Sequence, residues 1–131
     1  MSKVVFTNGC FDVLHHGHFK LLEFCSNLGA KLIVGINSDA SVSRLKGPDR
    51  PVNNQNVRKF NLECIRFVDE VVVFEEDTPL EKMKLIRPDI IVKGGDYDVD
   101  SIVGSDIFDT RIFKYVYGFS TTKQLKGIAR G

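Results

Sequence analysis

All three histidines of the chain stand within four positions, at the end of the segment Gly-Cys-Phe-Asp-Val-Leu-His-His-Gly-His that covers residues 9–18. His15 and His18 are three positions apart, so on a helix their imidazoles share one face. A helix start also presents unpaired backbone N–H groups and the positive end of the helix dipole, which attract phosphate. Gly17 lets a ligand approach the backbone closely. The cluster therefore indicates an anion site, with two alternatives: an accidental grouping, or a structural zinc site that has Asp12 available but no distant Cys/His pair.

Charges along the chain balance in number but not in position. The 131 residues include 18 basic and 17 acidic side chains, for a net charge of +1, which gives no general support for a nucleic-acid partner. Residues 44–59 contain five cations and one carboxylate, whereas residues 96–109 contain five aspartates and no cation. This separation is typical of a protein that holds a compact anion, and solvated loops are the alternative explanation.

Composition indicates an ordinary globular protein. With 43% hydrophobic, 10% aromatic and 27% charged residues, we expect one domain over residues 1–131. No apolar run approaches the roughly 18 residues of a membrane span, and the first residues do not form a secretory signal. Cys10, Cys25 and Cys64 cannot all pair and form no Cys-x-x-Cys. We therefore expect reduced thiols and a cytoplasmic protein without membrane contact.

The elements that must position the histidines alternate along the chain. We expect strands at 3–7, 31–36, 70–74, 89–93 and 111–117, and helices at 16–28, from Asn53 or Asn54 to 67, at 79–86 and from Ser120 onward. This alternation predicts right-handed βαβ units, and hence an α/β, Rossmann-like, doubly wound parallel sheet in a single domain. Ligands of such folds bind beyond the carboxyl ends of the strands, where the strand order reverses. The loops after Thr7, Ile36, Lys93 and Tyr117 are therefore expected to form the site.

Two motifs resemble those of a known family. His15-x-Gly17-His18, following Gly9-Cys-Phe-Asp12, resembles the His-x-Gly-His motif of the cytidylyltransferase-like nucleotidyltransferases. Gly118-Phe-Ser-Thr-Thr122 resembles the second motif of the same family, a Gly-x-Ser-Thr-Thr helix start. The two motifs lie at opposite ends of the chain, each between an expected strand and an expected helix, so the resemblance covers nearly the whole sequence.

Within this family the chain most resembles the D-glycero-manno-heptose 1-phosphate adenylyltransferases. The resemblance rests on segments 37–39, 45–47, 50–52, 74–79 and 92–97. Glycerol-3-phosphate cytidylyltransferases share the end motifs, but they typically have Gly-Asp-Asp-Trp at Gly94-Gly-Asp-Tyr97 and an arginine at Tyr115. The resemblance implies an enzyme that joins a nucleoside triphosphate, with ATP favoured, to a sugar phosphate, with heptose 1-phosphate favoured, and releases pyrophosphate. The alternative within the family is a CTP-dependent cytidylyltransferase acting on glycerol 3-phosphate or another phosphomonoester.

The resemblance also implies roles for individual residues. Catalytic donors to the reacting phosphate would be His15, His18 and Lys46. Nucleotide-binding residues would be Cys10, Phe11, Gly17, Lys93, Gly94, Gly95, Asp96, Ser120, Thr121 and Thr122. Substrate-binding residues would be Asp12, Arg50 and Arg58, the two arginines as bidentate phosphate clamps and Asp12 by orienting a histidine or helping to hold a metal.

Structural roles remain the alternatives for several of these residues. Asp12 can instead cap a turn, Lys46 can be a surface lysine, and the two arginines can be an exposed pair at a helix start. The segment 93–96 can be an ordinary strand-ending turn, and Ser120 a plain helix cap.

The resemblance also implies partners. Mg²⁺ is implied by the family and by the charge of the substrates, although the sequence contains no clear metal-ligand set. The family implies a homodimer. Alternatives from other classes are an aminoacyl-tRNA synthetase fragment and an inactive nucleotide-binding regulator.

Overall fold

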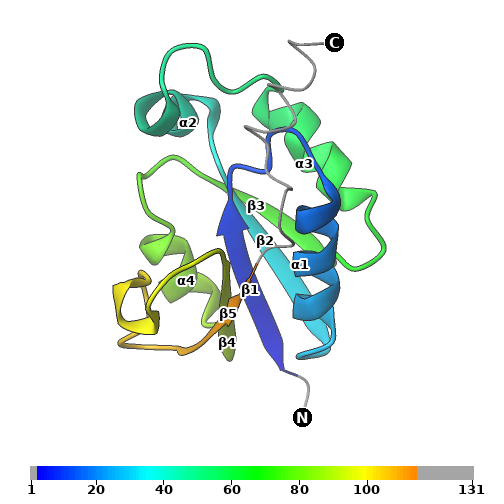
Figure 1. Cartoon of the computed structure of the whole chain (residues 1–131), viewed down its shortest axis with the longest axis vertical. Helices are drawn as coiled ribbons and strands as arrows, with labels where there is room; N and C mark the ends of the chain where they lie inside the picture. Colours follow the sequence, from blue (N-terminus) through cyan, green and yellow to red (C-terminus); the bar gives the residue numbers. More distant parts are fainter. Residues whose placement is uncertain (1–2, 115–131) are drawn as a thin grey trace.

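A computed structural model describes residues 3–114, which form a five-stranded parallel sheet covered by helices (Figure 1). The strands are β1 (Val4–Gly9), β2 (Lys31–Asn37), β3 (Glu70–Phe74), β4 (Ile90–Gly94) and β5 (Asp109–Phe113). Their order in the sheet is β3-β2-β1-β4-β5, and every neighbouring pair is parallel. Strands β2 and β3 thus lie on one side of β1, and strands β4 and β5 lie on the other side. This confirms the expected doubly wound sheet and puts its reversal of strand order between β1 and β4.

Hydrophobic side chains fill both faces of the sheet because successive residues of a strand point to opposite sides. On one face, Val5 and Val34 pack with Leu22 of α1 (His16–Ser26) and Leu62 of α3 (Gln55–Glu63). The second face is covered by α4 (Leu80–Ile86) and the segment that includes the short 3₁₀ helix η1 (Val99–Ser101). Its buried cluster is Phe6, Ile33, Met83 and Ile91. No helix within residues 3–114 is long and apolar enough to span a membrane.

One helix was not expected from the sequence: α2 (Asp39–Lys46), which follows β2 directly. The Ser38 side chain caps its start by accepting a hydrogen bond from the N–H of Ser41. Serine and valine are weak helix formers, so local propensity did not indicate this helix. The helix ends at Gly47, whose φ of +109° suits glycine. Lys46 therefore lies at the end of a helix, within the basic stretch 44–59.

Several expected boundaries were wrong by a few residues. The helix expected over 16–28 ends at Ser26, and the helix expected to reach 67 ends at Glu63. The predicted cap of that second helix is confirmed, since Asn54 accepts a hydrogen bond from the N–H of Val57. After Glu63 the chain continues in turns whose apolar side chains still pack on the core, so their spacing resembled a longer helix. Beyond β5, the expected end of the last strand and the helix from Ser120 lie outside the described residues.

The core has no space for a side chain at Gly35, in the middle of β2. A Cβ atom there would lie 2.6 Å from Cζ of Phe6, which is fully buried. We expect Gly35→Ala to lower the free energy of unfolding by about 1–3 kcal/mol, as overpacking does in well-packed cores. Urea unfolding measures this loss in Gly35→Ala, in Phe6→Leu and in the variant that carries both substitutions. If the double variant loses as much as the two single variants together, the proposed clash is wrong.

Candidate active site

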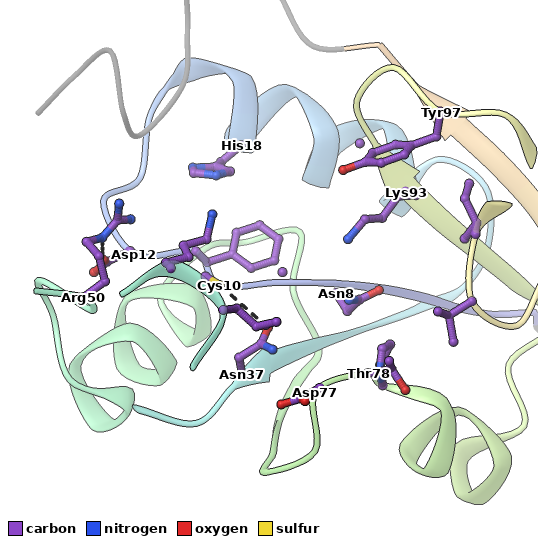
Figure 2. Close-up of a pocket in the computed structure, with 18 of the residues that line it drawn as sticks. Asn8, Cys10, Asp12, His18, Asn37, Arg50, Asp77, Thr78, Lys93 and Tyr97 are labelled. Carbon is purple, nitrogen blue, oxygen red and sulfur yellow. Dashed lines mark hydrogen bonds and ion pairs between the residues drawn. The ribbon is translucent and has the colours of Figure 1, made fainter. Parts of the chain in front are cut away.

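A cavity of about 580 Å³ opens at the reversal of strand order (Figure 2). This volume is typical of a small-molecule site. Its lining comes from the ends of β1, β2, β4 and α2, the loop after β1 with the start of α1, Arg50, the loop after β3, and residues 97–103. Nine of the predicted site residues line it: Cys10, Phe11, Asp12, His15, His18, Lys46, Arg50, Lys93 and Gly94. The structure therefore brings together residues that are up to 84 positions apart in the sequence.

His15 and His18 form the start of α1 through reciprocal hydrogen bonds. His15 is the N-cap residue, and its Nδ1 accepts a hydrogen bond from the N–H of Gly17 at 3.1 Å. His18 reaches back, and its Nδ1 accepts from the N–H of His15 at 3.3 Å. The two rings stack with their centroids 3.8 Å apart. The motif thus satisfies backbone donors that a helix start otherwise leaves unpaired, as a capping box does.

These hydrogen bonds also assign the tautomer of both rings. Since each Nδ1 accepts a hydrogen bond, each neutral imidazole carries its hydrogen on Nε2. Burial, with a smaller contribution from His15, lowers the pKa of His18 to about 3. Burial and the neighbouring His16 also lower the pKa of His15. Near neutral pH both rings are therefore uncharged hydrogen-bond donors through Nε2.

Cationic side chains supply the positive charge of the cavity. Lys46 reaches it from the end of α2, Arg50 from the following segment, and Lys93 from β4, with its ammonium directed toward the centre of the cavity (Figure 2). Burial, and to a smaller extent the charge of Lys46, lowers the pKa of Lys93. An anion bound beside Lys93 would counteract both effects, so the site favours a negatively charged ligand.

Cys10 is a neutral part of the cavity wall. Burial raises the pKa of its thiol despite the nearby cations, and its Sγ lies 3.8 Å from Oδ1 of Asn37. Phe11 follows in a left-handed backbone conformation with φ of 49°, and its ring lies against His18 with centroids 5.1 Å apart. These two predicted nucleotide-binding residues therefore shape the wall next to the histidines.

The carboxylate of Asp12 is hydrogen-bonded to other groups of the protein. Its side chain is 1% exposed, and its carboxylate accepts hydrogen bonds from Nε of Arg50 and from the N–H groups of Val52 and Asn53, each at 2.8–2.9 Å. Burial alone would raise the pKa of this carboxyl, but these hydrogen bonds hold it below its ordinary value. Of the sequence-based alternatives for Asp12, the geometry agrees with the turn-capping role, and this residue ties segment 50–53 to the histidine loop.

Arg58 does not lie where the sequence prediction put it. We expected a phosphate clamp, but its side chain is 0% exposed and does not line the cavity. Its Nε donates to the carbonyl of Asn53, its Nη1 to the carbonyls of Cys10 and Asn37, and its Nη2 to the carboxylate of Asp39. The prediction of a phosphate clamp is corrected accordingly, because these donors of Arg58 bind acceptors within the protein and the residue lies outside the cavity lining.

The remaining predicted residues lie around or beyond the cavity. Gly17 is buried in the first turn of α1, where its N–H donates a hydrogen bond to Nδ1 of His15. Gly95 and Asp96 follow β4 but are absent from the cavity lining, and the φ of +131° at Gly95 belongs to a turn against which Tyr97 packs. Ser120, Thr121 and Thr122 lie outside the described residues, so their predicted roles stay predictions.

Sequence reasoning missed part of the wall. Asn8 is the penultimate residue of β1 and Asn37 is the last residue of β2. Asp77 and Thr78 come from the loop after β3, on the side of the cavity across from Lys93 (Figure 2). Tyr97 adds an aromatic side chain. The loop after β3 was not among the expected ligand loops, although it follows the carboxyl end of a strand as the others do. Its position after the carboxyl end of a strand was the signal that could have placed this loop at the site.

The described part of the chain contains no group of three His, Cys, Asp or Glu side chains placed to hold a metal ion. Asp12, the carboxylate nearest the histidines in sequence, has both oxygens engaged by protein donors. Asp12 is therefore not available as a metal ligand in this arrangement. A divalent ion at this site would arrive with a polyphosphate ligand.

Known proteins are similar to this chain over most of its length. A family model described as Cytidylyltransferase-like matches residues 6–125. The Bifunctional protein HldE of a Nitratiruptor species is 57% identical over 122 residues, which are 92% of this chain and 26% of that protein. The protein of the same name from Campylobacter curvus is 55% identical over 128 residues, 97% of this chain and 27% of that protein. The chain thus spans about a quarter of the length of these relatives.

A solved structure is also similar. It is the crystal structure of the lipopolysaccharide core biosynthesis protein from Thermoplasma volcanium GSS1, with a TM-score of 0.73 and 26% sequence identity. The match covers 88% of this chain and 98% of that chain. The likeness in fold therefore extends over most of this chain.

The capping role of His15 can be separated from its role as a donor. His15→Asn keeps a side-chain acceptor at the N-cap, whereas His15→Ala removes it, so we expect only the alanine variant to lose about 1 kcal/mol of folding free energy. Both variants lose the Nε2 donor. Urea unfolding at pH 7 measures the difference, and equal losses in the two variants would show that the cap contributes nothing.

The lowered pKa of His18 makes stability depend on pH. The unfolded chain takes up a proton near the ordinary histidine pKa of 6.5, whereas folded His18 does so only near 3. Acidification from pH 7 to 5 therefore favours the unfolded state, by up to about 1.4 kcal/mol per pH unit for this residue. His18→Asn keeps an acceptor for the N–H of His15 and does not titrate. We expect its free energy of unfolding to fall less steeply over this range, and an unchanged slope would contradict the assignment.

Proposed function

Because the chain belongs to the cytidylyltransferase-like family and is a nucleotidyltransferase, we propose that it transfers a nucleotidyl group from ATP to a sugar phosphate, with heptose 1-phosphate favoured. The products are a nucleotide-sugar and pyrophosphate. The observation that carries this proposal is the pair of neutral Nε2–H donors at the start of α1, in a cavity that also contains Lys46, Arg50 and Lys93. Such a set of donors fits phosphoryl oxygens.

The reaction needs no covalent enzyme intermediate. An oxygen of the acceptor phosphate attacks the α-phosphorus of the triphosphate, a new P–O bond forms, and the bond to the β-phosphate oxygen breaks. Both electrons of the broken bond leave with pyrophosphate. The protein contributes positioning and stabilisation of the charge on the phosphoryl oxygens, as in phosphoryl transfer generally.

Each group in the cavity has a defined part in this reaction. Nε2–H of His15 and of His18 would donate to oxygens of the reacting phosphate, and neutral rings do so without giving up a proton. Lys46, Arg50 and Lys93 offset the repulsion between the two anionic substrates. The rigid start of α1 keeps the donors in place during the transfer, so little reorganisation is required.

Two lines of support favour the sugar phosphate. The segments 37–39, 45–47, 50–52, 74–79 and 92–97 resemble the heptose 1-phosphate branch, and each of them contributes at least one residue to the cavity wall. The solved neighbour is described as a lipopolysaccharide core biosynthesis protein. The competing substrate pair is CTP with glycerol 3-phosphate, to which the loop Gly94–Tyr97 is less similar.

Mg²⁺ enters this proposal as part of the metal–triphosphate substrate, because the described residues provide no carboxylate set for it. Roles for Ser120, Thr121 and Thr122 at the triphosphate, and a homodimer, remain part of the proposal on the strength of the family resemblance. The acceptor must come from a reaction that phosphorylates a sugar, since the site is suited to transfer onto an existing phosphate.

Pyrophosphate release with Mg²⁺ tests the function, with ATP and CTP each combined with heptose 1-phosphate and glycerol 3-phosphate. We expect release with ATP and the heptose phosphate. His18→Asn keeps the helix cap but removes the Nε2 donor, so turnover should fall about a hundredfold or more. His16→Asn, at the exposed neighbouring position, is the matched control and should retain turnover.

Release only with CTP and glycerol 3-phosphate would overturn the choice of substrates and keep the role of the histidines. Normal turnover of a folded His18→Asn variant would overturn the phosphate-donor role itself. Absence of release in all four combinations would contradict the proposed substrate class.

A further inference from the structure

A buried guanidinium lies beneath the cavity and is not explained by the chemistry above. Arg58 belongs to α3, and its side chain is 0% exposed. Burying a charge is costly unless it is paired and hydrogen-bonded. Arg58 meets this condition with four hydrogen bonds of 2.7–3.0 Å, of which three are to backbone carbonyls and one to a carboxylate.

The acceptors of Arg58 belong to separate segments, and each of these segments carries part of the site. The carbonyl of Cys10 opens the loop to the two histidines, and the carbonyl of Asn37 ends β2. Asp39 is the first residue of α2, which carries Lys46 at its other end. The carbonyl of Asn53 belongs to the segment that carries Arg50. One guanidinium thus joins the elements that supply both histidines and two cations.

The hydrogen bond from Arg58 to the carbonyl of Cys10 lies next to a strained turn. Phe11, the following residue, has φ of 49°, which a bulky residue rarely adopts. Its ring is 5% exposed and lies against the imidazole of His18. A left-handed conformation at such a residue persists only when its surroundings hold it, and the hydrogen bond from Nη1 of Arg58 to the carbonyl of Cys10 is one such hold.

The same segments are tied from the cavity side by Asp12. Its carboxylate accepts from Arg50, Val52 and Asn53, while the carbonyl of Asn53 accepts from Arg58. Asn53 is therefore held from both sides, by a buried anion and a buried cation. Loss of Arg58 would leave the buried carbonyl of Asn37 and the part-buried carbonyls of Cys10 and Asn53 without this donor, and the segments would shift or admit water to satisfy them.

We propose that Arg58 is a positioning residue for nucleotidyl transfer, which holds the histidine loop, the start of α2 and the Arg50 segment in register without touching substrate. This inference rests on the function proposed above. It replaces the direct phosphate clamp expected from the sequence. Displacement of reacting groups by about 1 Å typically costs about a hundredfold in rate, so the predicted effect of Arg58 is mainly on kcat.

The test compares Arg58→Met and Arg58→Lys with Arg111→Met in the full chain. Arg111 is an exposed arginine that pairs with Asp109 on β5, outside the cavity lining, so its variant controls for the lost charge. Turnover is measured well below the thermal midpoint of each variant, with circular dichroism reporting the folded fraction. We expect kcat per folded molecule to fall about a hundredfold in Arg58→Met and less in Arg58→Lys, with smaller changes in KM and wild-type values in Arg111→Met.

A second readout follows the imidazoles directly. Nitrogen NMR of the ring atoms at one pH should show changed His15 and His18 signals in Arg58→Met and unchanged signals in Arg111→Met. A role confined to stability would lower the thermal midpoint but leave kcat per folded molecule and the ring signals as in the wild type. That result would overturn the proposal.

Two further measurements keep the outcome decisive. If the Arg58 variants do not fold, Asp39→Asn weakens the contact at Nη2 from a carboxylate that is 42% exposed, and a severalfold lower kcat is expected. Wild-type kcat in that variant would overturn the proposal.

If the wild-type chain turns over no substrate pair, the proposed function fails, while the ring signals of His15 and His18 still decide whether Arg58 positions the histidines.

Discussion

The site depends on one small set of hydrogen bonds, the reciprocal contacts by which His15 and His18 begin α1. A helix start needs acceptors for its first N–H groups. Here imidazole Nδ1 atoms provide them, which leaves each neutral ring with its hydrogen on Nε2. The same contacts therefore stabilise the helix and prepare two donors for an anion. Because burial keeps the rings uncharged, the donors do not depend on protonation near neutral pH.

Charge is divided between two layers of the structure. Lys46, Arg50 and Lys93 face the cavity, where a polyanion would bind. The side chains of Asp12, at the cavity wall, and Arg58, outside the cavity lining, are both buried, and each is hydrogen-bonded to the loops that carry the first group. Residues that bind an anion must give up water readily, whereas residues that hold loops must keep fixed partners. Distribution over two layers lets the site meet both requirements.

The sheet explains why these loops meet. β1 has β2 on one side and β4 on the other, so the segments that leave β1 and β4 diverge and open a space between them. The loops after β1, β3 and β4 and the end of α2 all contribute to that space. Relatives that are roughly four times as long contain a segment similar to this chain. In this chain, residues 3–114 form the layered sheet that carries the cavity.

The sequence by itself determined the alternating parallel fold, the position of the histidine motif at a strand-to-helix turn, and the family. These follow from local periodicity and from residues close together in the chain. It did not determine α2, whose serines have weak helix propensity and whose stability comes from its cap and from packing on β2. It also did not distinguish Arg50 from Arg58. The two arginines are eight positions apart and alike in type, but one lines the cavity and the other is buried beneath it. Only tertiary structure decides which carbonyls surround a guanidinium, because those carbonyls come from strands and loops distant in sequence.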